Sequence, residues 1–475
     1  MIIMKQLNKL IFYSFCVMLI VSSVGCEKSY LQKDPSTGVA LNIAITSESD
    51  LKAATAGIYA QLRDYRIYGR NLIAKGDIMS DNVYVSSSNT GRQAANFNVY
   101  NFIATDADAT NIFNYLYDAI KRCNQVINSS IATSANVNEY KGEAYAARAL
   151  CYLDLVRNFA YPYAKDTSAP GVPIVTTFNS DAKPARSSVG TVYKQIISDL
   201  EAAYGLMTIY QSSGYLSKYA ARALEARVYM DMADWTNAKT VALDVINNGG
   251  FSLVTSANYV AYWGDPTLST NKQEIIFEIA CDATNNNGTE ALSNLYSQSS
   301  YGDYLVTKDL YNVYASTDIR RSLIVSGTHG GFTVWVSKKY PNTTSTTDRD
   351  DVPILRYAET LLILAEAYYN LNDNTNALKY LNMVAQQRDP SFAGYTSTGA
   401  STLENILLEK RKEFAFEGLR YWDLYRLQRT FTKVVEENPY TSLNIVVPTT
   451  KGVRFPIPQS ETDANINDKQ NAEYQ

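Results

Sequence analysis

The feature that most constrains the fold is a pair of short amphipathic segments that occurs twice, in residues 353–384 and in residues 217–247. In the first copy, apolar side chains recur every three or four residues on both sides of the stretch LNDNTN, as expected for two helices joined by a turn. Small residues stand where the two helix backbones would approach each other. Each copy has an alanine, a tyrosine three residues later and a second alanine nine residues beyond: Ala365, Tyr368 and Ala377, and Ala226, Tyr229 and Ala238.

This spacing is the core of the tetratricopeptide pattern of paired helices. The two copies are far apart in the sequence, so the intervening segments must leave the helical scaffold and return to it. Further helical patterns occur at about 49–65, 111–128, 139–159, 188–207 and 402–428. Ser188 is a suitable N-cap for the helix at 188–207. We therefore predict a mainly α fold in which tetratricopeptide-like helical pairs form one scaffold, with long irregular loop insertions and minor β structure.

Composition narrows the possible functions. The chain has 475 residues with a net charge of −4 and a pI near 5.4, which argues against nucleic acid as a partner. The single histidine, His329, and the lack of a C-x-x-C pair argue against a histidine triad, a multi-histidine metal site and a zinc ribbon. We expect no histidine-based catalytic site, no metal site and no cofactor. The 37 tyrosines suit helix packing and ligand stacking equally well.

The first 26 residues predict an exported lipoprotein. Two lysines precede the apolar run IFYSFCVMLIV, which is followed by the small residues SSVGC. The run could be a membrane anchor, but its length and flanks favour a cleaved secretion signal, and SSVGC resembles a bacterial lipoprotein cleavage site. We expect residues 1–25 to be the signal peptide, Cys26 to carry acyl chains such as palmitate, and residues 26–48 to be the lipidated tether.

Three cysteines remain in the mature body of the chain, at positions 123, 151 and 281. Cys123 and Cys151 lie in apolar helical patterns, so we interpret them as buried free thiols.

The rest of the mature chain is expected to form a single helical domain, residues 49–475, with an N-terminal part at about 49–210 and a C-terminal part at about 250–475. Two regions lack a helical period: the polar stretch 77–110 and residues 250–350, in which EIIFEIA and FTVWVS are typical of short strands. Long loops are uncommon in compact domains and are often functional. We therefore expect the working surface in these two regions.

Five segments resemble those of a known family: RALCYLDLVRNFAYPYA, RSSVGTVYKQIISDLEAA, PILRYAETLLILAEAYY, LLEKRKEFAFEGLRYWDLYRL and FPIPQSETDANIND. With these elements in this order, the chain resembles the SusD/RagB family of nutrient-uptake lipoproteins over its mature length. Two positions depart from the family pattern. Gln470-Asn471 is followed by Ala-Glu-Tyr rather than by the Pro-Gly-Tyr often found there, and Phe113 replaces a tryptophan that is usual before the second helix.

The resemblance implies a lipid-anchored protein on the outer face of the cell outer membrane. Members of such a family are not enzymes. They sit over a SusC-like TonB-dependent transporter, bind a glycan or sometimes a peptide, and deliver it for uptake. The resemblance also implies a SusD-like helical core with tetratricopeptide-like pairs.

The charged segment 404–429 is the best place to look for catalysis. Glu413 and Glu417 are one helical turn apart, within the range of a glycosidase carboxylate pair. Arg420 follows Glu417 at an interval of three, and Asp423 and Arg426 continue that interval, so ion pairing along a helix is the favoured interpretation. Carboxylates beside arginines have lowered pKa values, which does not suit a general acid.

Candidate binding residues lie in the two irregular regions. Sugar rings present C–H faces that pack on aromatic planes, and their hydroxyl groups need polar partners nearby. Trp235 and Trp422 lie in helical motifs and are assigned to packing. The candidates for ligand contact are Asp81, Asn82, Tyr84, Arg92, Asn96, Trp263, Tyr301, Tyr304 and Trp335.

Three functions remain open from the sequence. The first is capture of an oligo- or polysaccharide for a transporter, and the second is capture of a non-glycan nutrient such as a peptide by the same architecture. The third is a secreted glycoside hydrolase, which requires a carboxylate pair outside ion-paired surroundings.

Overall fold

The computed structural model describes residues 45–88, 94–179, 181–344, 346–437 and 440–475. The signal peptide, Cys26, most of the tether and Arg92 lie outside the described residues.

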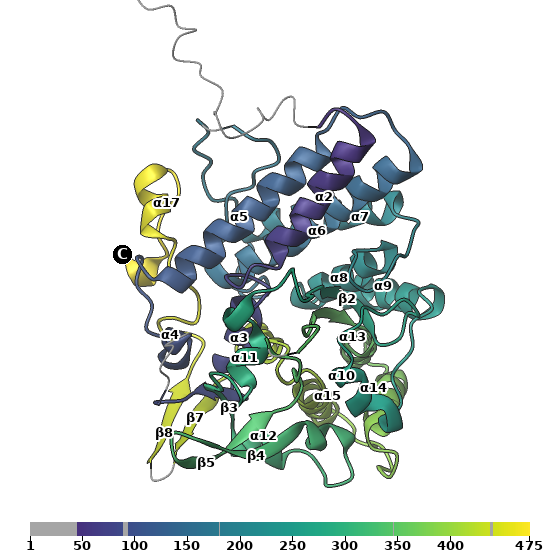
Figure 1. Ribbon diagram of the computed structural model, residues 1–475, viewed down its shortest axis with the longest axis vertical. Coiled ribbons are helices and arrows are strands. Elements are labelled where there is room, and N and C mark those ends of the chain that lie inside the picture. Colours follow the sequence, from purple (N-terminus) through teal and green to yellow (C-terminus); the bar gives the residue numbers. More distant parts are fainter. Residues whose placement is uncertain (1–44, 89–93, 180, 345, 438–439) are drawn as a thin grey trace, which may run out of the picture.

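Four helices form an antiparallel stack in the upper part of the molecule (Figure 1). Polar residues cap their N-termini as the sequence predicts: Ser188 accepts a hydrogen bond from the backbone N–H of Thr191, and Ser47 with Asp50 makes a capping box. Cys123 and Cys151 are fully buried in this stack, which confirms their interpretation as free thiols. The helices are α2 (Glu48–Leu62), α5 (Ala107–Ile127), α6 (Ala135–Phe159) and α7 (Val189–Leu206).

The two predicted hairpins are present and pack against each other. Within each hairpin the two helices pack against each other, α8 on α9 and α13 on α14. Helix α7 packs on α8 and α9 packs on α13, so the helices form one continuous stack. The four motif alanines are fully buried, which allows the close approach of the helix backbones. The mainly helical tetratricopeptide-like fold is confirmed. The hairpin helices are α8 (Lys218–Asp231), α9 (Trp235–Asn248), α13 (Tyr357–Asn370) and α14 (Asn374–Arg388).

Two helix boundaries differ from the prediction. The hairpin predicted at residues 353–384 does not begin at residue 353, because Val352–Arg356 forms strand β6, paired antiparallel with β2 (Ile275–Ile279). The predicted helix 402–428 is two helices, α15 (Ala400–Glu413) and α16 (Arg420–Arg426). The chain between them turns at Phe416 and Gly418, which have φ of 70° and 74°.

A small sheet lies at the lower edge of the molecule (Figure 1). Its four strands have the order β1-β3-β5-β4, with antiparallel pairing throughout. A separate hairpin packs on this sheet, since its first strand contacts β1 and β5. The strands predicted from EIIFEIA and FTVWVS are confirmed as β2 and β5. The sheet strands are β1 (Val83–Val85), β3 (Tyr304–Val306), β4 (Ile324–His329) and β5 (Phe332–Ser337), and the hairpin is β7 (Phe431–Glu437) and β8 (Tyr440–Val446).

The stretch 77–110 was predicted to be a long polar loop, but its described parts, residues 77–88 and 94–110, are largely structured and buried. It contains β1 and a short helix, and many of its side chains belong to a core that extends from Leu51 to Ile457. Apolar residues such as Val83 and Phe97 are interspersed with polar ones in this stretch. The sequence therefore shows no apolar period from which the burial could be predicted. The remaining short helices are α3 (Asn71–Ile78), α4 (Ala95–Val99), α10 (Tyr259–Gly264), α11 (Leu292–Tyr296), α12 (Lys308–Asn312) and α17 (Gln459–Ala464).

Candidate functional site

Asp81 and Asn82 join the segment before β1 to the helices α15 and α16. Arg420 donates from Nε and Nη2 to the two carboxylate oxygens of Asp81, at 2.8 and 2.9 Å. Arg411 donates from Nε to the side-chain oxygen of Asn82 at 3.0 Å. Burial alone would raise the pKa of Asp81, but Arg420 and Arg411 hold it below its usual value. Both polar groups are therefore engaged within the protein.

Three of the aromatic candidates are buried. Tyr84 is 1% exposed and donates its hydroxyl hydrogen to the backbone oxygen of Glu436. Tyr304 is fully buried, and the ring of Trp263 lies under the ammonium group of Lys339 at 4.2 Å. The structure thus places these rings inside the protein.

Trp335 forms part of a half-buried stack on the small sheet. It lies on β5 opposite Ser326 of β4. Its ring stacks on Tyr311 with centroids 3.8 Å apart and planes 17° from parallel. The guanidinium carbon of Arg321 lies 4.5 Å from the centroid of the same tyrosine ring. We call Arg321, Tyr311 and Trp335 the aromatic stack. The rings of Tyr311 and Trp335 are held nearly parallel, so they can act as a platform on which a flat apolar face of a ligand packs.

Three loops meet beside the turn of the β4–β5 hairpin, and we call them the loop cluster: residues 86–88, 298–303 and 328–331. The backbone N–H of Ser86 donates to the backbone oxygen of Asp303 at 2.9 Å. Gln298 donates to the backbone oxygen of Gly302 at 2.7 Å. The candidate Tyr301 belongs to this cluster and is half-buried.

His329 connects these loops. Its Nδ1 lies 3.2 Å from the side-chain oxygen of Gln298, and its Nε2 lies 3.3 Å from Oδ1 of Asp303. Burial raises the pKa of Asp303, and the neighbouring His329 opposes that rise. The amino-acid sequence contains no signal for this trio, since Gln298 and His329 are 31 residues apart and contact each other only in the folded chain.

Asn96 has a local structural contact. Its amide donates to the carboxylate of Asp106, and Asp106 in turn caps the N-terminus of α5. Of the described candidates, Trp335 and Tyr301 are therefore the aromatic residues with part of the ring at the surface.

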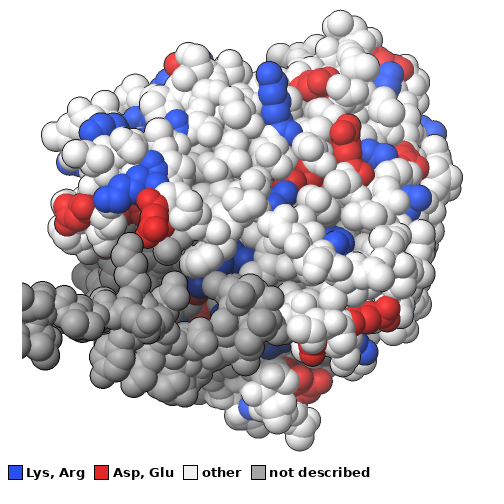
Figure 2. Space-filling model, turned by 90° about the horizontal axis from the view of Figure 1, so that it is seen from above, with Lys and Arg blue, Asp and Glu red and all other residues white. Residues whose placement is uncertain are grey.

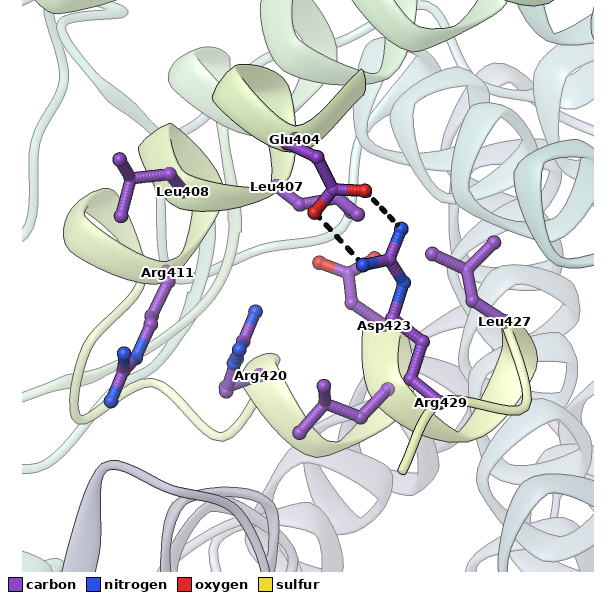
Figure 3. Close-up of a pocket in the computed structure, with 9 residues that line it drawn as sticks. Glu404, Leu407, Leu408, Arg411, Arg420, Asp423, Leu427 and Arg429 are labelled. Atoms are coloured by element: carbon purple, nitrogen blue, oxygen red, sulfur yellow. Dashed lines mark hydrogen bonds and ion pairs between the residues drawn. The ribbon is translucent and has the colours of Figure 1, made fainter. Parts of the chain in front are cut away.

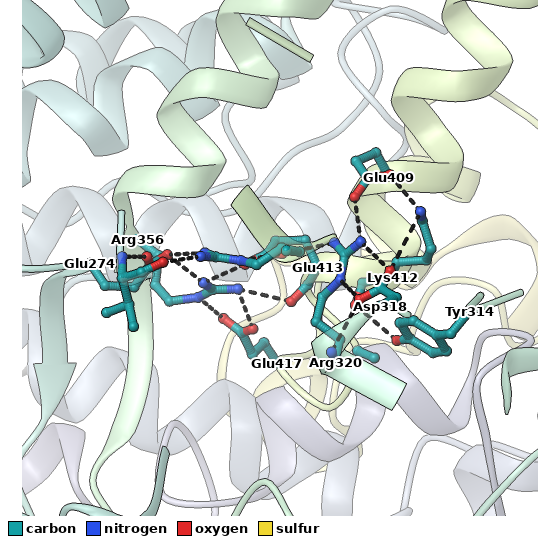
Figure 4. A network of polar contacts seen from close by, with 12 residues as sticks. Glu274, Tyr314, Asp318, Arg320, Arg356, Glu409, Lys412, Glu413 and Glu417 are labelled. Atoms are coloured by element: carbon teal, nitrogen blue, oxygen red, sulfur yellow. Dashed lines mark hydrogen bonds and ion pairs between the residues drawn. The ribbon is translucent and has the colours of Figure 1, made fainter. Parts of the chain in front are cut away.

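The carboxylates considered for catalysis lie in a buried ion network (Figure 4). Arg356 donates to Glu413 at 2.8 Å and to both oxygens of Glu417 at 2.7 Å. Arg388 and Arg320 also contact Glu413. Burial alone would raise the pKa of Glu413, but the three guanidinium groups hold it well below its usual value. A carboxylate in this state cannot serve as a general acid near neutral pH.

The predicted pairing within this segment is partly wrong. Asp423 and Arg426 are paired at 2.7 Å, as their spacing predicts. Arg420, however, pairs with Asp81 and not with Glu417, because the chain leaves the helix between residues 413 and 420.

A cavity of about 180 Å³ lies between α15 and α16 (Figure 3). Leucine side chains alternate around it with charged ones, and the two oxygens of Glu404 accept hydrogen bonds from Arg429 at 2.6 and 2.9 Å. Arg420 and Arg411 also line it, and both already contact Asp81. The guanidinium groups are thus balanced by carboxylates of the protein itself.

Across the described ranges, no group of three or more histidine, cysteine or acidic side chains is arranged to hold a metal ion. In the same ranges, no helix combines the length and apolarity needed to cross a bilayer. On the face seen from above, acidic and basic side chains are interspersed among a larger neutral area (Figure 2).

Comparison with known proteins identifies relatives along most of the chain. The model of the SusD family matches residues 322–474. A second model, described as starch-binding and associating with the outer membrane, matches residues 29–230. One of the SusD-like proteins of Formosa agariphila is 24% identical over 92% of this chain and 95% of its own length.

Solved structures agree with these matches. A putative sugar binding protein from Bacteroides vulgatus is 30% identical to this chain, with a TM-score of 0.82 over 91% of this chain and all of that one. A SusD superfamily protein from the same organism is 27% identical, also with a TM-score of 0.82 and the same coverage.

Proposed function

Because this chain belongs to the SusD family, a family of carbohydrate-binding proteins, we propose that it captures a glycan at the cell surface without cleaving it. The captured oligo- or polysaccharide is then delivered to a SusC-like TonB-dependent transporter in the outer membrane. The protein is held on the outer face of that membrane by acyl chains on Cys26.

The observation that carries this proposal is the aromatic stack. Trp335 is fixed by Tyr311 beneath it, so little conformational entropy is lost when a sugar ring packs on its outer face. Two exposed hydroxyl groups lie on the same face of the sheet as Trp335: that of Ser326, its direct partner on β4, and that of Thr333, two residues along β5. His329 lies at the turn of the same hairpin but on the opposite face, because its partner Phe332 is three residues from Trp335. Aromatic planes and nearby polar groups together match the C–H faces and hydroxyl groups of a saccharide.

Non-enzymatic action is supported by the surroundings of Glu413 and Glu417. Each carboxylate is occupied by buried guanidinium groups, which leaves no described oxygen of this pair free to protonate a glycosidic oxygen.

Isothermal titration tests the proposed site. A glycan that binds the wild-type protein should bind Trp335→Ala at least tenfold more weakly, because the variant loses the platform. Trp235→Ala is the matched control, since Trp235 is also a half-buried tryptophan but lies at the start of α9. Equal affinity of Trp335→Ala and wild type for every bound glycan would contradict the placement of the site.

A further inference from the structure

A cavity larger than the one between α15 and α16 lies at the upper end of the molecule, away from the small sheet. It has a volume of about 450 Å³ and is bounded by helix α5, by residues 173–179 and 182–184, and by helix α17. Figure 1 shows α5 and α17 at the opposite end of the molecule from β4 and β5. The α5 cavity, as we call it, therefore shares no residue with the aromatic stack or the loop cluster.

Asparagine amides fasten the walls of the α5 cavity to one another. From α5 and the residue after it, Asn124 donates to the backbone oxygen of Val175, and Asn128 donates to that of Thr176, each at 2.8 Å. From the C-terminal segment, the amides of Asn465 and Asn467 donate to the backbone oxygens of residues 184 and 183, also at 2.8 Å. A cavity whose walls are bonded in this way is formed before any ligand arrives, which lowers the entropy cost of binding.

Aromatic rings supply apolar surface inside and at the rim of the cavity. Phe113 is 3% exposed, and Tyr117 is fixed by the hydrogen bond from its hydroxyl to the backbone oxygen of Pro173 at 2.7 Å. Phe178 lines the same cavity and is 54% exposed. An exposed phenylalanine beside a preformed cavity offers a ring face that a ligand can cover.

Polar groups in the lining balance each other in charge. Asp118 and Glu461 contribute two carboxylates, and Lys121 and Lys183 contribute two ammonium groups. Within the described residues, Asn114 makes no side-chain hydrogen bond, so its amide is free to donate and accept. The volume lies within the range of about 300–1,000 Å³ that is usual for small-molecule sites.

From these observations we propose that the α5 cavity is a second saccharide site, which takes a short neutral oligosaccharide. The rings pack on its C–H faces, and the amide and charged side chains bond its hydroxyl groups. Charge balance in the lining favours a neutral sugar over an acidic one. This inference rests on the proposed function and extends it, because two separated sites on one protein hold a long glycan more firmly than either alone.

Titration with maltohexaose, cellohexaose, xylohexaose and mannohexaose tests the second site. For a hexasaccharide that binds, wild type should bind two molecules, and Trp335→Ala should bind one. Ala464→Trp fills the cavity from α17, and Phe178→Ala removes the rim ring; either change should lower affinity at the second site at least tenfold. Ala400→Trp places the same large side chain at an exposed position on α15 as a control.

The outcomes separate the two proposals. If Ala464→Trp and Phe178→Ala titrate like wild type while Trp335→Ala abolishes binding, the second site is refuted and the proposed function stands. If binding survives Trp335→Ala and is lost in Ala464→Trp, the cavity is supported and the aromatic stack is refuted. Failure of all four hexasaccharides to bind wild type at 10 mM, a concentration of the order that detects weak sites, refutes the second site.

Discussion

Single residues in this protein show how buried charge is made tolerable. Arg356, Arg388 and Arg320 surround Glu413, and each is nearly or fully buried. Such a network costs desolvation free energy, and it persists because every member has a partner. Removing one member of this buried network therefore lowers the stability of the protein far more than removing one member of an exposed ion pair.

We predict that Glu413→Gln lowers the free energy of unfolding by about 3–5 kcal/mol, because it leaves buried guanidinium groups without a balancing charge. The matched control is Glu404→Gln on the same helix, whose partner Arg429 is partly exposed. Its effect should be about 0–1 kcal/mol. Urea unfolding followed by circular dichroism measures both, and a Glu413→Gln variant as stable as the control would contradict the network's structural role.

Glu143 makes a prediction about pH. Burial raises its pKa to about 8, although Tyr59 donates a hydrogen bond that acts in the opposite direction. In the folded protein the group therefore holds its proton at pH values where the unfolded chain has released it. Its contribution to stability is complete below the unfolded pKa near 4.5 and is lost as pH rises toward 8.

The Glu143→Gln variant cannot ionise and should lose less stability than wild type between pH 5 and pH 8.5. Chemical unfolding at several pH values measures the difference, which should favour the variant at the alkaline end. Parallel stability curves for the two proteins would show that Glu143 is ionised in the folded state.

At the scale of elements, a break between α15 and α16 allows the C-terminal half to pack on α3. A Cβ atom at Gly418 would lie 2.6 Å from the backbone oxygen of Ile73, and one at Gly76 would lie 1.8 Å from the backbone oxygen of Gly418. The carboxylate of Asp77 accepts hydrogen bonds from the backbone N–H groups of Phe416 and Gly418, at 3.1 and 2.7 Å. Two backbones can cross here only because both glycines lack a side chain.

We predict that Gly418→Ala destabilises the protein by more than about 2 kcal/mol, because alanine clashes with backbone and is strained at a φ of 74°. The control is Gly205→Ala in α7, where no atom lies within 4 Å of the new Cβ. That change should stabilise by about 0.5–1 kcal/mol through helix propensity. Thermal unfolding measures both shifts, and a Gly418→Ala protein with unchanged stability would contradict the close crossing.

The elements also show what could be predicted from the sequence and what could not. The hairpin helices were predicted because their apolar period and small residues are local signals. The break at Gly418 could not be predicted, because it is caused by α3, more than 300 residues earlier in the chain. For the same reason the sequence predicted Asp81 and Asn82 to be loop residues that bind a ligand, while in the structure their partners are Arg420 and Arg411.

At the scale of the whole molecule, the two halves share one core. Lys75, from the N-terminal half, is fully buried; its ammonium group lies 4.4 Å from the ring of Trp422 and 4.3 Å from that of Phe455. It also donates to the side-chain oxygen of Asn158 at 2.6 Å. Desolvation holds the pKa of Lys75 well below its usual value. The two halves are thus joined in one core. Tyr304 and Val306 of the small sheet belong to the same core, and Trp335 and Tyr311 pack against it, which gives the aromatic stack a constant position.

Membrane attachment makes a prediction at the same scale. Changing Cys26 to alanine removes the acylated thiol, so the protein should move from the membrane fraction to the soluble fraction. The Cys281→Ala variant, which changes a buried free thiol, should remain with the membrane. Fractionation of cells with immunoblotting measures the distribution, and detergent-dependent retention of Cys26→Ala would refute the lipid anchor.

The central claim is capture of a glycan without cleavage, and one combined measurement tests it most directly. Purified protein is run through native gels that contain a panel of polysaccharides, and each retarding polysaccharide is then incubated with the same protein and assayed for new reducing ends. The account predicts retardation by at least one polysaccharide and no release of reducing ends. Release of reducing ends would contradict the non-enzymatic claim, and an absence of retardation by every polysaccharide would contradict glycan capture in favour of a non-glycan nutrient such as a peptide.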